Sequence, residues 1–133
     1  MRTLSNVMSP TMESPLPAAP ILVVEDEPLI ALDIEDALAV LGAPVLLARN
    51  LAEARLALAG AVAPCLVLLD VLLPDGRSFD LAQELIAANV PLAFLTGYDH
   101  GIPETLREVT VIDKPFSTDV LVALAEQALK RAG

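Results

Sequence analysis

The sequence predicts an α/β fold, a doubly wound parallel sheet with helices on both faces. From Ile21 onward, short apolar runs alternate with amphipathic helical patterns, and five such units fit into about a hundred residues. The aliphatic run 66–69 ends on Asp70 and breaks into Pro74-Asp75-Gly76, as expected for a strand that is buried on both faces. Apolar residues make up 55% of the chain but aromatic residues only 3%, so the core must be aliphatic.

The length and composition indicate one cytoplasmic domain. The chain has 133 residues, a formal net charge of -10, one cysteine and no signal-peptide or membrane-spanning run. The negative charge argues against binding to nucleic acid, and Cys65 is expected to be a small buried hydrophobic residue. Residues 1–20 are rich in proline and lack periodicity, which predicts a disordered leader before an ordered domain at 21–131.

Each element of the fold has its own signal. The expected strands span 21–24, 44–48, 65–70, 91–96 and 109–113, and helices are expected at 28–41, 51–59, 79–88, 104–108 and from 118 onward. Asn50 and Glu53 are a possible N-cap and capping-box pair, and Ser78 is expected to cap the third helix. The last helix should turn four residues inward: Val120, Leu121, Leu124 and Leu129.

Polar residues occur where the predicted strands end. Glu25 and Asp26 follow the first strand, and Asp70, Thr96 and Lys114 end or follow the last three. In a parallel sheet these ends share one edge, so the groups can converge. Close carboxylates favour Mg²⁺, and a carboxylate beside a lysine and a hydroxyl suits phosphoryl transfer.

Taken singly, each of these residues also has an ordinary structural explanation. The acidic run 25–27 could be a solvated first helical turn, Asp70 could begin a turn, and Lys114 could be a surface lysine. Their joint occurrence at matching strand ends favours a site. Four other polar residues show no such convergence and are expected to be loop or surface residues: Asp75, Asp99, His100 and Asp113.

Over residues 21–131 the sequence resembles the receiver domain of two-component response regulators. The similarity lies in the opening strand and acidic pair at 21–28, the segment 68–74 around Asp70, Thr96, and Lys114-Pro115-Phe116. The resemblance implies a flavodoxin-like sheet with the strand order 2-1-3-4-5. It also implies a cis peptide bond before Pro115.

The resemblance assigns roles to the strand-end residues. Asp70 would accept a phosphoryl group from a histidine kinase. Asp26, Asp70 and the backbone carbonyl of Leu72 would bind Mg²⁺, with Glu25 assisting. Two further residues would contact the phosphate: Thr96, as the switch hydroxyl, and Lys114.

Three features depart from the common pattern. The loop after Pro74 is about two residues shorter than usual, and the segment 94–98 resembles the subgroup called FAT GUY receivers. Val111 stands where many receivers carry the switch aromatic. Tyr98 could replace that aromatic or could be a half-buried loop residue. The weakly apolar segment 101–108 is expected to be mobile and to become less so on phosphorylation.

These observations predict a single-domain, Mg²⁺-dependent response regulator that signals through a protein partner and is not an enzyme. A phosphate sink or phosphorelay intermediate would have the same sequence features. A degenerate receiver that works without phosphorylation is a third possibility, which the intact set of polar residues opposes. No membrane contact is expected, and the protein should be a monomer or weak homodimer. The expected partners are a histidine kinase and a downstream protein.

Overall fold

A parallel five-stranded sheet organises the chain in a computed structural model that describes residues 19–60, 62–97 and 101–132. The strands lie in the order β2-β1-β3-β6-β7, and every neighbouring pair is parallel. Their bounds are β1 Ile21–Val24, β2 Val45–Ala48, β3 Leu66–Asp70, β6 Leu92–Thr96 and β7 Thr110–Asp113. Counted within the sheet alone, this is the predicted order 2-1-3-4-5.

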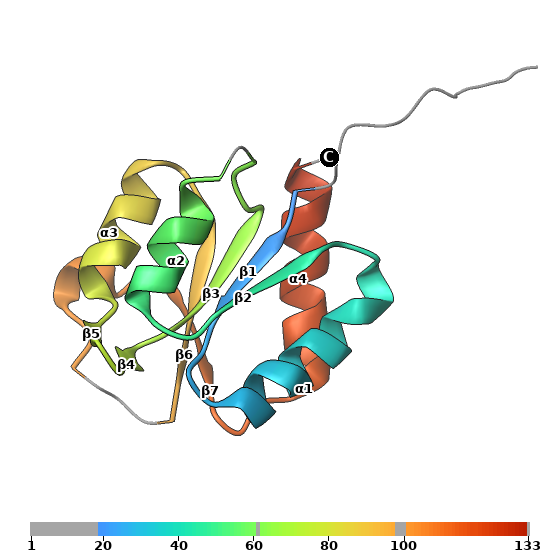
Figure 1. Cartoon of the computed structure of the whole chain (residues 1–133), viewed down its shortest axis with the longest axis horizontal. Helices are drawn as coiled ribbons and strands as arrows, with labels where there is room; N and C mark the ends of the chain where they lie inside the picture. Colours follow the sequence, from blue (N-terminus) through green and yellow to red (C-terminus); the bar gives the residue numbers. More distant parts are fainter. Residues whose placement is uncertain (1–18, 61, 98–100, 133) are drawn as a thin grey trace, which may run out of the picture.

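Helices cover both faces of the sheet, as predicted (Figure 1). One face carries α1 (Pro28–Leu38), which continues as a 3-10 turn at Ala39–Leu41, and α4 (Thr118–Ala132). The other face carries α2 (Leu51–Leu58) and α3 (Phe79–Ala87). A short 3-10 helix, Glu104–Leu106, leads from β6 towards β7.

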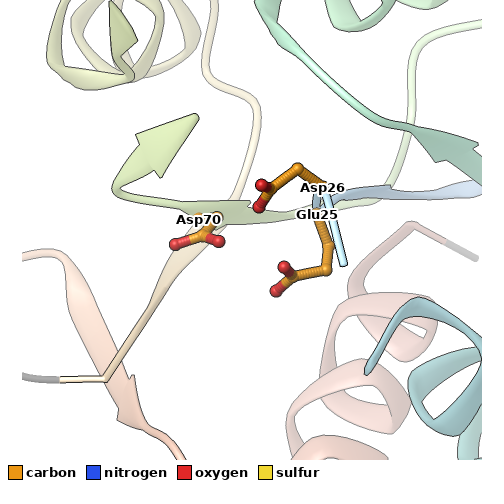
Figure 2. A group of neighbouring side chains, drawn as sticks. All are labelled: Glu25, Asp26 and Asp70. Carbon is orange, nitrogen blue, oxygen red and sulfur yellow. The ribbon is translucent and has the colours of Figure 1, made fainter. Parts of the chain in front are cut away.

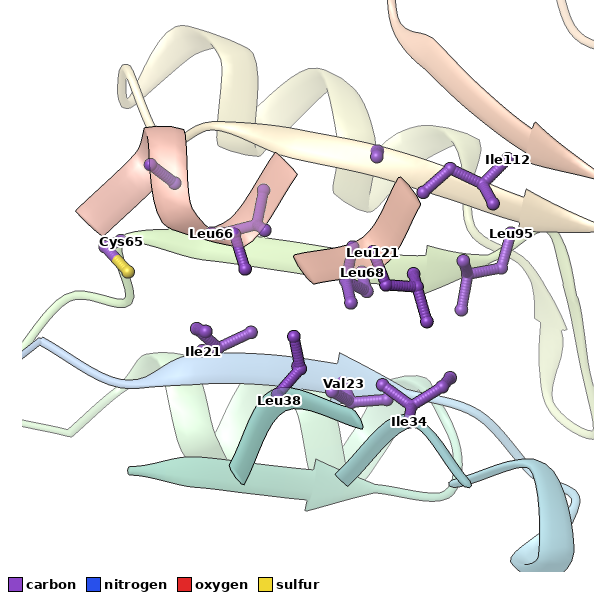
Figure 3. Packing of buried hydrophobic residues seen from close by; sticks show 13 residues of the cluster. Ile21, Val23, Ile34, Leu38, Cys65, Leu66, Leu68, Leu95, Ile112 and Leu121 are labelled. Atoms are coloured by element: carbon purple, nitrogen blue, oxygen red, sulfur yellow. The ribbon is translucent and has the colours of Figure 1, made fainter. Parts of the chain in front are cut away.

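Alternation along the strands divides the core into two layers. In β1, Ile21 and Val23 face α1 and α4, whereas Leu22 and Val24 face α2 and α3. Figure 3 shows the first layer, in which side chains of α1 and α4 close over β1 and β3. Cys65 is 5% exposed in this layer, which confirms that it is a buried residue.

A small hairpin between β3 and α3 was not predicted. Leu72–Leu73 (β4) pairs antiparallel with Gly76–Arg77 (β5) around a two-residue turn. Gly76 has φ +137°, a left-handed conformation that glycine adopts without strain. The hairpin therefore gives definite structure to the segment that follows Asp70.

The remaining local predictions have mixed outcomes. Asn50 caps α2 as expected, and the Lys114–Pro115 peptide bond is cis. Val120 is 51% exposed, so its inward placement was wrong, because α4 directs Leu121 to the core and Val120 lies one residue away around the helix. Most of the expected leader (1–18) lies outside the described residues. No helix of the described chain is long and apolar enough to cross a membrane.

Candidate functional site

The carboxyl edge of the sheet brings together side chains from three strands. Glu25 and Asp26 directly follow β1, Asp70 is the last residue of β3, and Lys114 directly follows β7. β1 and β3 are neighbours in register, so their ends lie side by side. The polar residues that the sequence singled out at these ends therefore meet in space, as the parallel topology requires.

Three carboxylates form the centre of the site. Glu25, Asp26 and Asp70 each offer one oxygen, and these oxygens lie within 4.8 Å of one another. Figure 2 shows the three side chains converging from the ends of β1 and β3. Glu25 is 2% and Asp70 6% exposed, whereas Asp26 is exposed. The cluster is thus buried on one side and open to solvent at Asp26.

Lys114 provides the positive charge next to this cluster. Its Nζ lies 2.7 Å from Glu25 Oε1 and 3.2 Å from Asp70 Oδ2. Its own side chain is only 16% exposed, so both ion pairs are largely shielded from water. One ammonium among three carboxylates leaves two negative charges without a counter-charge when all four groups are ionised.

Burial and charge shift the titration of this group in opposing ways. Burial raises the pKa of Glu25, and the charge of Asp70 adds to the rise, while bonds from Lys114 and the Glu27 amide oppose it. For Lys114, burial lowers the pKa, but the bond to Glu25 and the negative charge of Asp70 outweigh it, so the net shift is upward. Lys114 therefore stays charged while Glu25 holds its proton more readily than an ordinary glutamate.

The donor set fits a hard divalent cation. It consists of carboxylate oxygens alone, and Mg²⁺ prefers oxygen ligands and often binds through one or two carboxylates. The uncompensated negative charge favours a dication at the same place. Leu72, whose carbonyl was expected to join the ligands, lies in β4 two residues after Asp70, and its metal-binding role stays a prediction.

Thr96 ends β6, on the side of β3 away from β1. It lies one residue beyond Leu95, which pairs with Asp70 in the sheet, and it is 1% exposed. Its carbonyl oxygen accepts a hydrogen bond from the Lys114 amide at 2.8 Å, which links the ends of β6 and β7. This hydrogen bond holds the backbones of Thr96 and Lys114 side by side.

A hollow of about 290 Å³ lies beside Thr96. Leu106 and Val111 line it, and Val111 is 41% exposed. The hollow therefore borders Val111, the residue that the resemblance places at the switch-aromatic position. Tyr98, the alternative switch residue, lies outside the described residues, as do Asp99 and His100, so their expected roles stay predictions.

Two side chains near the site were not recognised as functional from the sequence. Ser78 was expected to cap α3, but its side chain makes no capping bond and its hydroxyl donates to the Asp70 carbonyl oxygen at 2.7 Å. Asp75 was expected to be an ordinary loop residue, but its carboxylate accepts from the amides of Leu51 and Ala52 at 2.9 and 3.1 Å.

Known proteins resemble this chain over most of its length. No protein-family model matches the sequence. The phyllosphere-induced regulator PhyR of Methylorubrum extorquens is 37% identical in an alignment of 117 residues that covers 84% of this chain and 44% of PhyR. The chain spans less than half the length of the curated relatives it matches.

Solved structures share the fold. A putative response regulator of Chloroflexus aurantiacus is 25% identical with a TM-score of 0.73, over 85% of this chain and 98% of that one. The PhyR response regulator REC domain of Erythrobacter litoralis is 30% identical with a TM-score of 0.70, over 89% of this chain and 95% of that one. This match covers nearly all of both chains. It shows that the chain belongs to the receiver domains of response regulators, which act in two-component signalling.

Proposed function

We propose that this receiver accepts a phosphoryl group on Asp70 from a histidine kinase, in a reaction that requires Mg²⁺. The observation that supports this most directly is the placement of Asp70 at the carboxyl edge of the sheet. There its carboxylate lies next to two further carboxylates and the Lys114 ammonium. An aspartate that only began a turn would need neither the neighbouring carboxylates nor the lysine.

The transfer is an in-line displacement at phosphorus. A carboxylate oxygen of Asp70 attacks the phosphorus of a phosphohistidine, and an O–P bond forms as the P–N bond breaks. The electron pair of the broken bond stays on the imidazole nitrogen of the kinase, and the product on this chain is an acyl phosphate. Mg²⁺, which Glu25, Asp26 and Asp70 would hold, would supply positive charge that offsets the negative charge of the phosphoryl group.

The protein's own residues orient and stabilise the phosphoryl group. Lys114 already lies 3.2 Å from one Asp70 oxygen, so its ammonium can pair with a phosphoryl oxygen with little movement. The Thr96 hydroxyl is a donor at the end of the adjacent strand. Both groups act on the phosphorylated state, and such contacts can couple the phosphate to the surrounding backbone.

The proposed role is that of a switch and not of a metabolic enzyme. The phosphorylated form would bind a downstream protein in the cytoplasm, with at most slow autophosphorylation and autodephosphorylation. The expected form is a monomer or weak homodimer. Recovery of a non-kinase protein only with the phosphorylated form would distinguish an effector from a phosphate sink.

Phosphorylation with acetyl phosphate tests the proposal. Intact-mass measurement of the wild type should show one added phosphoryl group with Mg²⁺ and none with EDTA. Asp70→Asn should abolish the adduct because the amide is a poor nucleophile. Asp80→Asn, an exposed residue in the first turn of α3, is the matched control and should label normally. An adduct that survives in Asp70→Asn, or a wild type that never labels, would overturn the assignment.

A further inference from the structure

Ser78 makes an unusual contact for a residue at the start of a helix. It lies directly before α3, and its residue is 0% exposed. Instead of capping α3, its Oγ donates to the Asp70 carbonyl oxygen at 2.7 Å and lies 3.4 Å from the Val71 carbonyl oxygen. A buried hydroxyl needs a hydrogen-bond partner, and this one has found it on the residue that carries the proposed phosphoacceptor carboxylate.

The backbone of Ser78 reinforces this contact. Its amide donates to the Val71 carbonyl oxygen at 3.0 Å, so side chain and main chain both hold the first two residues of the segment. Between Val71 and Ser78 the chain forms the β4–β5 hairpin. The segment from Asp70 to Ser78 is therefore a closed loop, and hydrogen bonds from the hydroxyl and the amide of Ser78 hold its two ends together.

We propose that Ser78 is a positioning residue for phosphoryl acceptance and metal binding at Asp70. Its hydroxyl fixes the peptide group that follows the Asp70 Cα, and thereby restricts the backbone torsion that sets this carbonyl relative to the carboxylate. The same contact orients the chain that leads to Leu72. This inference rests on the proposed function, because it concerns how the same carboxylate is held.

A purely structural serine would behave differently. If the hydroxyl only satisfied its own burial, its removal would reduce stability and leave the affinity for Mg²⁺ unchanged. If it positions Asp70, its removal should weaken metal binding and loosen the amides next to Asp70 even in the metal-free protein. The two roles are separable because affinity and stability are measured independently.

The experiment compares Ser78→Ala with Asn50→Ala. Asn50 caps α2 through the Glu53 amide, so its variant loses a local hydrogen bond of similar kind that involves neither Asp70 nor Ser78. Mg²⁺ affinity is measured by calorimetric titration without any phosphodonor. Ser78→Ala should bind Mg²⁺ about tenfold more weakly, the lower range for loss of a group that orients a metal ligand. Asn50→Ala should bind Mg²⁺ as the wild type does.

Two further measurements use the same variants. Amide hydrogen exchange at Val71 and Leu72 should be faster in metal-free Ser78→Ala, and unchanged in Asn50→Ala. With acetyl phosphate, Ser78→Ala should need more Mg²⁺ to reach half of its maximal phosphorylation rate. The expected pattern is a larger change in the Mg²⁺ requirement than in the rate at saturating Mg²⁺.

The outcomes separate the two proposals. Unchanged Mg²⁺ affinity in Ser78→Ala, or an equal loss in Asn50→Ala, would overturn the positioning role while leaving phosphorylation of Asp70 intact. A wild type that binds no Mg²⁺ and accepts no phosphate would overturn the proposed function itself. If Ser78→Ala does not fold, Ser78→Cys, which is slightly larger and a weaker hydrogen-bond donor, is measured in the same way. Weaker binding in Ser78→Cys supports the inference, and wild-type binding overturns it.

Discussion

At the scale of single residues, Lys114 and Glu25 depend on one another. The side chain of Glu25 is 0% exposed, and its Oε1 lies 2.7 Å from the Lys114 ammonium. Burial penalises a charge unless a partner compensates for it, so each of these two charges stabilises the other. Lys114 therefore holds the carboxylates together in the metal-free protein, in addition to its proposed contact with phosphate.

Replacement of Lys114 by methionine tests this dependence. Lys114→Met should lower the free energy of unfolding by about 2 kcal/mol in EDTA, less than for a fully buried pair because the cluster opens to solvent. Urea denaturation measures the loss, and Lys130→Met, in the exposed last turn of α4, is the control. Mg²⁺ should restore part of the stability by replacing the lost positive charge. Unchanged stability in EDTA would contradict this account.

Some site residues follow from sequence alone and others do not. Glu25, Asp26, Asp70 and Lys114 were predictable because each ends or follows an apolar run, and a parallel sheet brings such ends together. The role of Ser78 was not predictable, because its hydroxyl donates to a carbonyl oxygen eight residues earlier and does not cap the helix that follows it. A serine directly before a helix usually caps it, but Ser78 is buried against the loop that follows Asp70 and its hydroxyl bonds to that loop.

At the scale of elements, the β4–β5 hairpin is fastened to α2. Both Asp75 carboxylate oxygens accept from the first amides of α2, Leu51 and Ala52, where the helix presents unpaired N–H groups and a positive dipole. The bond from the Leu51 amide holds the pKa of Asp75 below its ordinary value, with Ala52 contributing further. The segment after Asp70 is thus held by Ser78 at its base and by Asp75 at its tip.

Asp75→Asn should give a pH-dependent loss of stability. Because the folded pKa is lowered, the ionised carboxylate stabilises the wild type above the ordinary pKa of 3.8, and this contribution is lost as pH falls through the folded value. Urea midpoints should therefore differ near neutral pH and converge in acid. Asn50→Ala should lower the free energy of unfolding by about 1 kcal/mol. Because the Asn50 side chain does not titrate, the difference in urea midpoint between this variant and the wild type should persist in acid. A constant gap for Asp75→Asn would refute the role.

Element boundaries show where sequence patterns lose power. The pattern at 104–108 predicted a helix with little apolar face, but Leu106 is 1% exposed and packs with the layer beneath α3. A single leucine carries too little periodicity to reveal such an anchor. The short hairpin was equally hidden, because two-residue strands have no alternation to detect. The long strands and helices were predictable because burial repeats along them.

At the scale of the whole molecule, Asp70 and Cys65 lie at opposite ends of β3. The carboxyl edge concentrates charge, whereas Cys65 lies just before β3 at the other edge, inside the layer covered by α1 and α4 (Figure 3). Burial raises the pKa of the Cys65 thiol, so little thiolate is available in the folded state. Because it is the chain's single cysteine, its labelling rate reports opening of the core without further engineering.

The labelling rate of Cys65 can show whether the carboxylate cluster lowers the stability of the metal-free protein. Three carboxylates within 4.8 Å repel one another, so Asp26→Asn should slow Cys65 labelling in EDTA by stabilising the folded state. In the wild type, Mg²⁺ at about tenfold above its Kd should add about 1.4 kcal/mol and slow labelling about tenfold. Asp26→Asn should lose most of this response, and Asp36→Asn, exposed on α1, should keep it. If Asp26→Asn responded to Mg²⁺ as the wild type does, Asp26 would not be a ligand and the repulsion would have no functional reason.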